Sequence, residues 1–256
     1  MSRDAPTPAG KLTRRPDPDS GARFGLARIL SKRGVCSRSV AAQWVAAGRV
    51  SVNGRVERNP EHPVREAVDR VELDGQVLEA PKRCCLMLNK PRGLVTTASD
   101  EQGRDTVYRC FDGHGLPWLA PVGRLDKASE GLLLFSNDPA WAARLCSPQE
   151  GPLKTYAVQV RGLCGDAQLS QLRAGVVEGG ERLAAKAIDL MRQGEKNSWL
   201  QVVLDEGRNR QIRRMLSTLN LPVIRLIRIA IGDLQLGELG KGEWRWLSES
   251  ETASLI

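Results

Sequence analysis

The sequence predicts an α+β protein with two domains: a small N-terminal domain, and a larger domain built on a mixed, largely antiparallel sheet. Its 256 residues, 41% of them hydrophobic, suffice for more than one core. A polar connector containing Pro81, "LDGQVLEAPKRCC", separates two stretches rich in helix and strand patterns and places the domain boundary near Arg83. Beyond this connector, strand patterns do not alternate regularly with helix patterns, which argues against a parallel, doubly wound sheet.

The net charge favours a polyanionic partner. Lys and Arg number 38 against 30 Asp and Glu, a formal net charge of +8, and this balance is typical of proteins that bind nucleic acid. A membrane surface is the alternative, but no apolar run approaches the ~20 residues that a spanning helix needs. We also find no basic amphipathic helix with an aromatic face. Nucleic acid is therefore the expected partner, and a membrane is not.

Cysteine and histidine usage narrows the possible chemistry. The six cysteines form no C-x-x-C pair and no signal peptide is apparent, which indicates reduced thiols in a cytoplasmic protein. The two histidines, His62 and His114, lie near no cluster of cysteines or carboxylates. A zinc site and a histidine base are therefore not expected. The chemistry must use carboxylate, tyrosine, lysine or arginine, without a metal or another cofactor.

The N-terminal part of the chain divides into a tail and a small folded unit. Residues 1–23 are expected to form a disordered tail, because they combine four prolines with mixed charges and almost no apolar residues. From Phe24 the pattern predicts a helix that ends at Gly34, and a second helix that begins after Ser37 and ends at Gly48. A strand "RVSV", a tight turn at 53–54 and a second strand "DRVELDG" complete the unit.

The small unit is strongly basic. Between Phe24 and Arg58 it holds seven basic residues and a single acid, which favours a phosphate-binding surface over an ordinary solvated face. The stretches "LSKRGVCSRS" and "AGRVSVNG" resemble the S4 domain, a small RNA-binding module. The resemblance implies that three residues face RNA: Arg38, Arg49 and Asn53.

The larger domain, residues 84–256, contains six strand patterns and four helix patterns. The strands are expected at 85–90, 132–136, 154–162, 198–204, 223–236 and 243–247. The helices are expected at 139–146, 165–175, 208–219 and 249–255, and the last opens with a possible capping box of Ser248 and Glu251.

An arginine-rich helix is expected within "DEGRNRQIRRMLSTL", residues 205–219. Its apolar residues have the i, i+3, i+4, i+7 spacing of one helix face. Arg210, Arg213 and Arg214 then share the opposite face. A solvated amphipathic helix does not require three arginines, whereas bidentate binding of phosphate or carboxylate favours arginine.

Three further stretches place polar residues at strand ends. "APVGRLDKASEGLLLFSND", residues 120–138, sets Asp126 between two cations and ahead of a buried strand. "LKTYAV", residues 153–158, puts Tyr156 on the same strand face as a valine, where a core tyrosine is the simpler interpretation. "LNKPRGLVTT", residues 88–97, is by itself only a turn with a basic residue on each side of Pro91.

Together, and in this order, the four stretches resemble the ribosomal RNA pseudouridine synthases of the family named for small-subunit pseudouridine synthase A. "GRLDKASEGLLL" matches the family's aspartate motif, "KTY" its tyrosine motif and "EGRNRQIRRM" its arginine motif. The resemblance implies that Asp126 is the nucleophile, that Tyr156 lies against the target base and that Arg213 pairs with Asp126. It also implies contacts with substrate RNA by a set of basic residues: Lys90, Arg124, Lys154, Arg210 and Arg214.

The resemblance covers about residues 24 to 250, and the departures from it are small. Proline and alanine follow "ND" where a glycine is usual, and Lys127 follows the aspartate where an aliphatic residue is usual. Neither change disturbs the three motifs. Among the relatives that modify large-subunit RNA, Lys127, Ser129 and "NRQIRRM" favour the F type, while "EGRNR" is shared with the B type.

The implied reaction explains why one aspartate suffices. Isomerising uridine breaks the C1′–N1 bond, turns the uracil and rejoins it through C5, so positive charge develops at C1′ and a carboxylate can stabilise or trap it. The uracil stays bound as the incoming nucleophile, so water should be kept out and Glu130 and Asp138 are expected to be structural. A paired arginine would keep Asp126 ionised. The target uridine must leave its stack, which favours loops or bulges.

Two other functions are considered. A catalytically inert RNA-binding or ribosome-assembly protein would have lost one of the three motifs, and all three are present. A glycosidase requires a second carboxylate at a defined distance, which a sequence does not establish. The expected substrate is ribosomal RNA, 23S rather than 16S, and the expected oligomeric state is a monomer.

Overall fold

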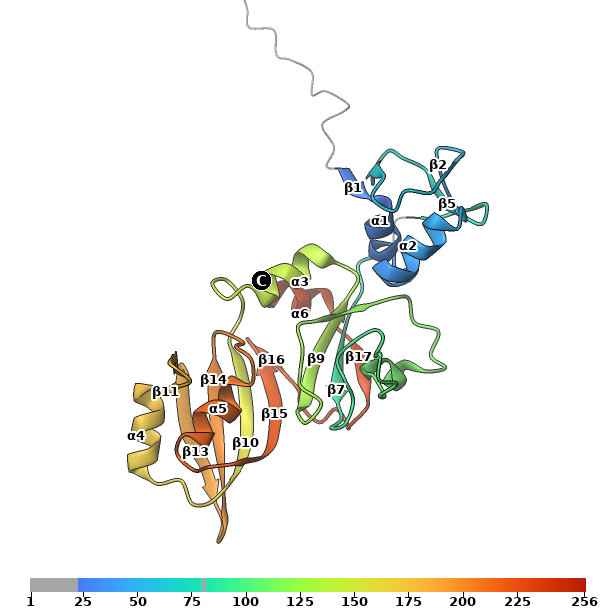
Figure 1. The fold of residues 1–256 in the computed structure, drawn as a ribbon. Coiled ribbons are helices and arrows are strands. Elements are labelled where there is room, and N and C mark those ends of the chain that lie inside the picture. Colours follow the sequence, from blue (N-terminus) through green and yellow to red (C-terminus); the bar gives the residue numbers. More distant parts are fainter. Residues whose placement is uncertain (1–22, 80–81) are drawn as a thin grey trace, which may run out of the picture. The chain divides into compact units, whose positions relative to one another are not determined.

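The computed structural model describes residues 23–79 and 82–256 (Figure 1). Of the tail expected at residues 1–23, only Arg23 falls within this part, and it begins a strand instead. The chain divides into two compact units. One comprises the residues up to Leu30 together with Arg38–Ala80, and the other comprises Ser31–Ser37 together with Pro81–Ile256.

The smaller unit contains the two predicted helices, α1 (Leu26–Lys32) and α2 (Arg38–Ala46). Its four-stranded sheet has the order β3-β2-β5-β6, with β2 at Val50–Val52, β3 at Arg55–Glu57, β5 at Val71–Leu73 and β6 at Gln76–Val77. The predicted turn joins β2 to β3, since Asn53 and Gly54 both adopt positive φ, 52° and 79°. Four strands of this unit were not predicted: β3, β6 and a separate pair, β1 (Arg23–Gly25) with β4 (Pro63–Arg65).

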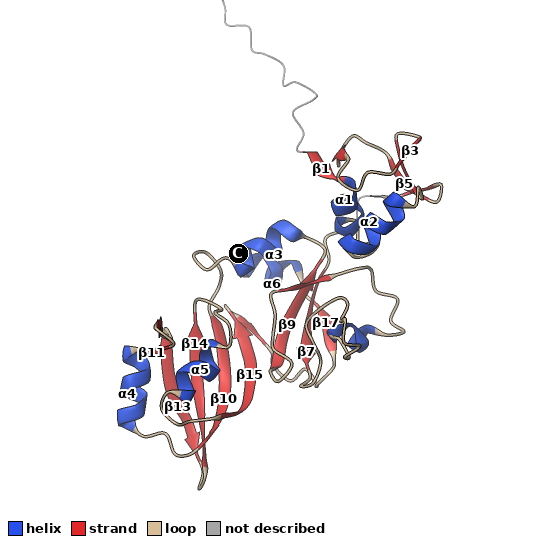
Figure 2. Cartoon of the chain, viewed as in Figure 1, coloured by secondary structure: helices blue, strands red, loops and turns tan. Residues whose placement is uncertain are grey.

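The larger unit is built on a nine-stranded sheet (Figure 2). Along the main path the order is β13-β14-β10-β15-β9-β7-β17, while β16 pairs with β15 and β8 pairs with β9. Only the β15–β9 pair is parallel among the strand pairs of the described residues, so the predicted mixed, largely antiparallel sheet is confirmed. The strands are β7 (Cys85–Lys90), β8 (Ala120–Val122), β9 (Glu130–Ser136), β10 (Lys154–Arg161), β13 (Ala187–Gln193), β14 (Asn197–Leu204), β15 (Val223–Ile231), β16 (Leu234–Gln235) and β17 (Trp244–Trp246).

The helices of the larger unit agree with the sequence patterns. They are α3 (Pro139–Cys146), α4 (Asp166–Ala174), α5 (Gln211–Ser217) and α6 (Glu249–Ser254), with a 3-10 helix η1 at Val107–Phe111 and a hairpin of β11 (Val176–Glu178) and β12 (Glu181–Leu183). Helix α5 lies on the face of β10 and β14 in Figure 2, where its Ile212, Met215 and Leu216 join the core of those strands. The predicted capping box of Ser248 and Glu251 opens α6.

The parallel junction of β9 and β15 unites the two halves of the sheet. It consists of two residue pairs, Ile227 with Glu130 and Arg228 with Gly131. A Cβ atom on Gly131 would lie 2.3 Å from the Arg228 carbonyl oxygen, and the φ of Gly131 is +100°. Glycine is therefore required for β15 to approach β9. Strand β9 comes immediately after the loop that carries Asp126.

Candidate active site

Asp126 lies in the loop between β8 and β9, where the chain turns before entering the sheet. The main-chain oxygen of Asp126 accepts a hydrogen bond from the Ser129 amide at 2.9 Å, which closes a tight turn at residues 126–129. The neighbouring Leu125 is buried, while the Asp126 side chain is exposed. The apolar residue therefore anchors the loop and leaves the carboxylate accessible.

The segment "LNKPRGLVTT", residues 88–97, holds the Asp126 loop in place through hydrogen bonds. The Thr96 hydroxyl donates to the Leu125 carbonyl at 2.8 Å, and the Gly93 amide donates to the Lys127 carbonyl at 2.8 Å. Hydrogen bonds therefore fix the backbone immediately before and after Asp126. The segment "LNKPRGLVTT" therefore supports the Asp126 loop, a role that its sequence alone did not indicate.

Lys90 is a correction to the predicted RNA-contacting residues. Its side chain is fully buried at the end of β7, and its Nζ donates to the carbonyls of Pro91 and Ser129, each at 3.0 Å. Burial lowers the pKa of Lys90 to about 8, although the nearby Cys110, Glu130 and Asp126 act in the opposite direction. A buried amine with two internal acceptors braces the Asp126 loop and leaves no surface for RNA to contact.

Arg213 approaches the same loop from α5 but does not form the predicted direct pair. Its guanidinium donates to the Ala128 carbonyl at 3.1 Å and to the Val223 carbonyl at 3.4 Å. Burial lowers the pKa of Arg213, and the charge of Asp126 opposes this effect, so the two groups interact electrostatically. Within the described residues no ion pair of 4.0 Å or less joins them.

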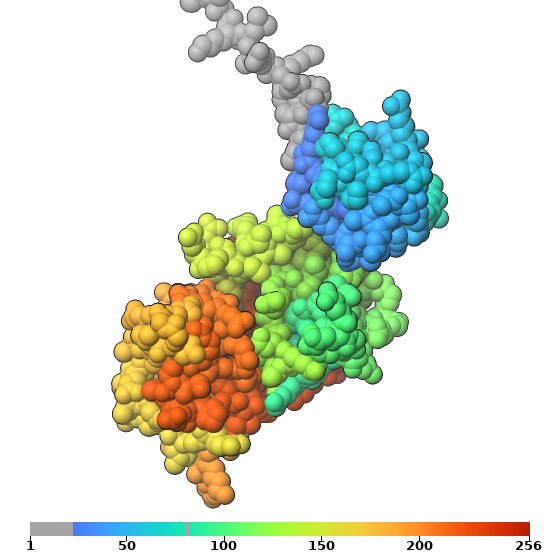
Figure 3. Space-filling model, viewed as in Figure 1, coloured from blue at the N-terminus to red at the C-terminus, as the bar shows by residue number. Residues whose placement is uncertain are grey.

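A pocket of about 340 Å³ opens beside Asp126. Tyr156 and Lys154 of β10 and Arg228 of β15 belong to its lining, together with the loop after β14 that leads to α5. In Figure 3 the light-green surface of residues around 125 meets the orange surface of residues around 210. The Tyr156 side chain is half-buried and packs against the apolar cores of both halves of the sheet.

A carboxylate, a tyrosine and several cations thus share one pocket, with one further arginine behind the carboxylate. Residues 85–218 match the family described as RNA pseudouridylate synthase, and residues 24–71 match the S4 domain. The chain belongs to the RNA pseudouridylate synthase family. The three catalytic motifs that carried the resemblance all lie within residues 85–218, and the enzyme class that they predicted is confirmed.

Known relatives and one solved structure extend the likeness over most of the chain. An uncharacterized RNA pseudouridine synthase of Aquifex aeolicus is 35% identical over 231 residues, which are 90% of this chain and 92% of that protein. The ribosomal large subunit pseudouridine synthase B of Escherichia coli K12 is 36% identical over 89% of this chain and 80% of its own length. A crystal structure of a pseudouridylate synthase, 29% identical, has a TM-score of 0.62 and covers 92% of this chain. The predicted resemblance to the large-subunit types is confirmed.

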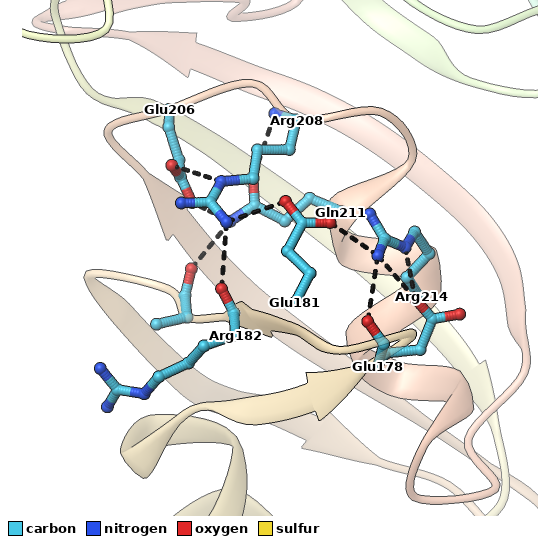
Figure 4. A network of polar contacts seen from close by, with 8 residues as sticks. Glu178, Glu181, Arg182, Glu206, Arg208, Gln211 and Arg214 are labelled. Carbon is cyan, nitrogen blue, oxygen red and sulfur yellow. Dashed lines mark hydrogen bonds and ion pairs between the residues drawn. The ribbon is translucent and has the colours of Figure 1, made fainter.

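In this pseudouridine synthase, a network of charges holds the arginine motif (Figure 4). Arg208 pairs with Glu181 at 2.9 Å and with Glu206 at 2.8 Å, while Arg214 pairs with Glu178 at 2.6 Å and with Glu181 at 2.8 Å. Glu181, on the β11–β12 hairpin, therefore bridges both arginines. Arg214 was predicted to contact RNA, but in this structure its guanidinium is engaged with the hairpin.

The loop that the network holds contains a backbone outlier. Arg210 is the residue before α5 and has a left-handed conformation with φ 49°, which costs a non-glycine residue on the order of 1 kcal/mol. The next residue, Gln211, is buried and donates to the Ala184 carbonyl at 2.9 Å and to Glu206 at 2.7 Å. These bonds maintain a turn that leaves Arg210 exposed at the pocket. Arg124, in the loop between β8 and β9, is also exposed at the pocket.

The three predicted RNA-facing residues of the S4 domain are exposed and have partners within that domain. Arg38 pairs with Glu61 at 2.9 Å. Arg49 pairs with Asp74 and lies over the Trp44 ring at 4.7 Å. Asn53 hydrogen-bonds Asp69 and the Arg70 amide, so its side chain fixes the turn it occupies.

Sequence reasoning missed Arg228 and the glutamates of the β11–β12 hairpin. Arg228 follows Leu226 and precedes Ala230 on the buried face of β15, so a charged residue in the buried register was the available signal. Glu130 and Asp138, expected to be structural, pair with Arg225 and cap α3, respectively. The described residues contain no helix able to cross a membrane and no group of three metal-ligating side chains.

Proposed function

We propose that this pseudouridine synthase isomerises a specific uridine of 23S ribosomal RNA, with Asp126 as the nucleophile. The observation that carries the proposal is the single pocket that Asp126 and Tyr156 both line, with Arg213 behind the aspartate loop. The preference for 23S RNA rests on the names of relatives such as the large subunit pseudouridine synthase B of Escherichia coli. We further propose that the protein is a monomer and acts in the cytoplasm.

The reaction begins when the Asp126 carboxylate stabilises or bonds to C1′ of the target uridine. The C1′–N1 bond breaks and both of its electrons leave with the uracil. After the uracil turns, C5 bonds to C1′, any bond from Asp126 breaks, C5 loses its proton and N1 gains one. Atoms and charge balance without water or a second carboxyl, which distinguishes this step from glycoside hydrolysis.

Arg213 and Lys90 position the aspartate in this scheme. Arg213 binds the Ala128 carbonyl, and Lys90 binds the Ser129 carbonyl. Both contacts restrict the turn that directs the Asp126 side chain. Because Asp126 is exposed in the free protein, the RNA itself must cover the pocket and exclude water.

Tyr156 offers its ring to the extruded base, and exposed cations bind the flanking backbone. Arg124 and Arg210 lie at the pocket and are exposed, which suits contacts with phosphate groups. In the S4 domain, RNA would compete with Glu61 and Asp74 for Arg38 and Arg49. Such exposed pairs are weak, so the exchange costs little.

The target is tested by incubating the purified protein separately with 16S and 23S transcripts and mapping pseudouridine by carbodiimide-dependent primer-extension stops. The proposal predicts one stop, in 23S RNA. A stop in 16S RNA alone would refute the proposed target and leave the enzyme class intact. If neither transcript is modified, the same mapping on ribosomal subunits from cells lacking the protein decides whether an assembling particle is the substrate. Sedimentation of the protein tests the monomer.

A further inference from the structure

Arg228 is a buried cation on the floor of the pocket. Its side chain is 6% exposed, and its Nε donates to the Leu132 carbonyl at 2.7 Å. Its Nη2 is buried and has no hydrogen-bond partner among the described residues. Within the same part of the chain no carboxylate forms an ion pair with it, although buried arginines are normally paired.

Lys154 lies beside Arg228 in the same pocket lining. Burial lowers the pKa of Lys154, and the charge of the nearby Arg228 lowers it further. Asp205 partly offsets this effect through its charge, but its ion pair is with Lys186, at 2.9 Å. Among the described residues, neither of these two pocket cations forms an ion pair with a carboxylate, which is unfavourable unless a ligand supplies negative charge.

We propose that Arg228, assisted by Lys154, binds a carbonyl oxygen of the target uracil and stabilises the negative charge that the base carries after it separates from C1′. The inference rests on the proposed function of this pocket and adds a catalytic residue to it. When the C1′–N1 bond breaks, both electrons remain on the uracil and are shared by O2 and O4. A fixed cation in a site shielded from water stabilises such an anion strongly.

The position of Arg228 favours the base over the RNA backbone as its ligand. Arg228 is directly opposite Tyr156 in the register of β15 and β10, so the two side chains share one face of the sheet about 5 Å apart at Cβ. A base that packs on the Tyr156 ring would have its edge beside the guanidinium. The phosphates of an extruded nucleotide stay nearer the surface, where Arg124 and Arg210 are exposed.

The geometry of the turning base strengthens this assignment. Rotation of uracil by half a turn about the axis through N3 and C6 exchanges N1 with C5, and it also exchanges O2 with O4. A donor fixed opposite one carbonyl before the turn therefore meets the other carbonyl after it. One arginine can serve both ends of the reaction without moving.

The test measures the single-turnover rate of pseudouridine formation in a 23S transcript, and in parallel the Kd for that RNA as a function of salt. Arg228→Gln is expected to lower the rate at saturating enzyme by about 100-fold or more and to leave the Kd and its salt dependence unchanged. Arg228→Lys, which keeps the charge on a shorter side chain, is expected to give an intermediate rate. Arg161→Gln removes an exposed cation from the far end of β10 and should retain the wild-type rate.

Other outcomes would overturn the inference. An unchanged rate in Arg228→Gln would do so, and so would a weaker Kd whose salt slope falls by about 0.7, which identifies a phosphate as the ligand. If Arg228→Gln does not fold, wild-type protein with 2-thiouridine at the mapped position supplies the test. Sulfur accepts hydrogen bonds weakly, so a rate equal to that of uridine would contradict the proposal. Activity in Asp126→Asn would instead refute the proposed function, and the two failures are thereby distinguished.

Discussion

Gly131→Ala tests the parallel junction that unites the two halves of the sheet. The new Cβ would lie 2.3 Å from the Arg228 carbonyl oxygen and 2.8 Å from the Arg228 amide nitrogen, whereas real Cβ contacts under 3.0 Å are essentially never seen. The β9 and β15 backbones must therefore separate. This junction has only two residue pairs, so the separation disturbs both of them.

The loss of stability expected for Gly131→Ala has two contributions, and the same substitution at a second glycine separates them. Backbone strain at the positive φ of +100° costs on the order of 1–3 kcal/mol, and the forced separation adds about 1–3 kcal/mol. Gly93 has nearly the same φ, +102°, with nothing within 4 Å of its Cβ position, so Gly93→Ala should show the strain alone. Urea unfolding gives the free energy of unfolding of each variant, and Gly131→Ala should lose more stability than Gly93→Ala. Equal destabilisation of the two would refute the close-packing argument.

Three other perturbations test the support of the aspartate loop and the arginine motif. The pKa of Lys90 is lowered to about 8, so between pH 8 and 10.5 the unfolded chain binds more protons and the free energy of unfolding rises with pH. This rise should be on the order of 3 kcal/mol and should be absent in Lys90→Met, as measured by urea unfolding at pH 8 and at pH 10.5. An equal rise with pH in Lys90→Met would contradict the prediction. Thr96→Val removes a buried hydroxyl and should cost about 1–2 kcal/mol in thermal unfolding and slow catalysis, whereas Thr97→Val should do neither. Glu181→Gln should slow single-turnover modification by about tenfold with little loss of stability, and the exposed Glu195→Gln should match wild type.

Regular elements with a strong pattern were predictable from sequence. Strand β7 and helix α3 begin and end where the residue pattern placed them, because a short apolar run and an N-terminal Asp-Pro pair are unambiguous local signals. The expected strand at 223–236 is interrupted at Gly232, whose φ of +52° lets the chain fold back as β16. The hairpin β11–β12 has three residues per strand, too few for a periodicity to appear.

The chemistry of the site was visible in the motifs, but the partners of its side chains were not. Sequence placed Asp126 and Tyr156 in one pocket through family resemblance. It did not predict that Lys90 would be buried, since a lysine beside a proline turn normally reaches solvent. Nor did it predict that Arg214 would pair with Glu178, because that contact joins segments 36 residues apart. Long-range pairing of charges depends on the completed fold, which local patterns do not encode.

The central claim is that the Asp126 carboxylate performs the isomerisation. The most direct measurement compares wild-type protein with Asp126→Asn, a variant of the same shape without the charge, by carbodiimide-dependent primer extension on ribosomal RNA. We predict that the stop made by the wild-type protein is absent with Asp126→Asn, while binding of the same RNA is retained. A stop of equal intensity with Asp126→Asn would contradict the account.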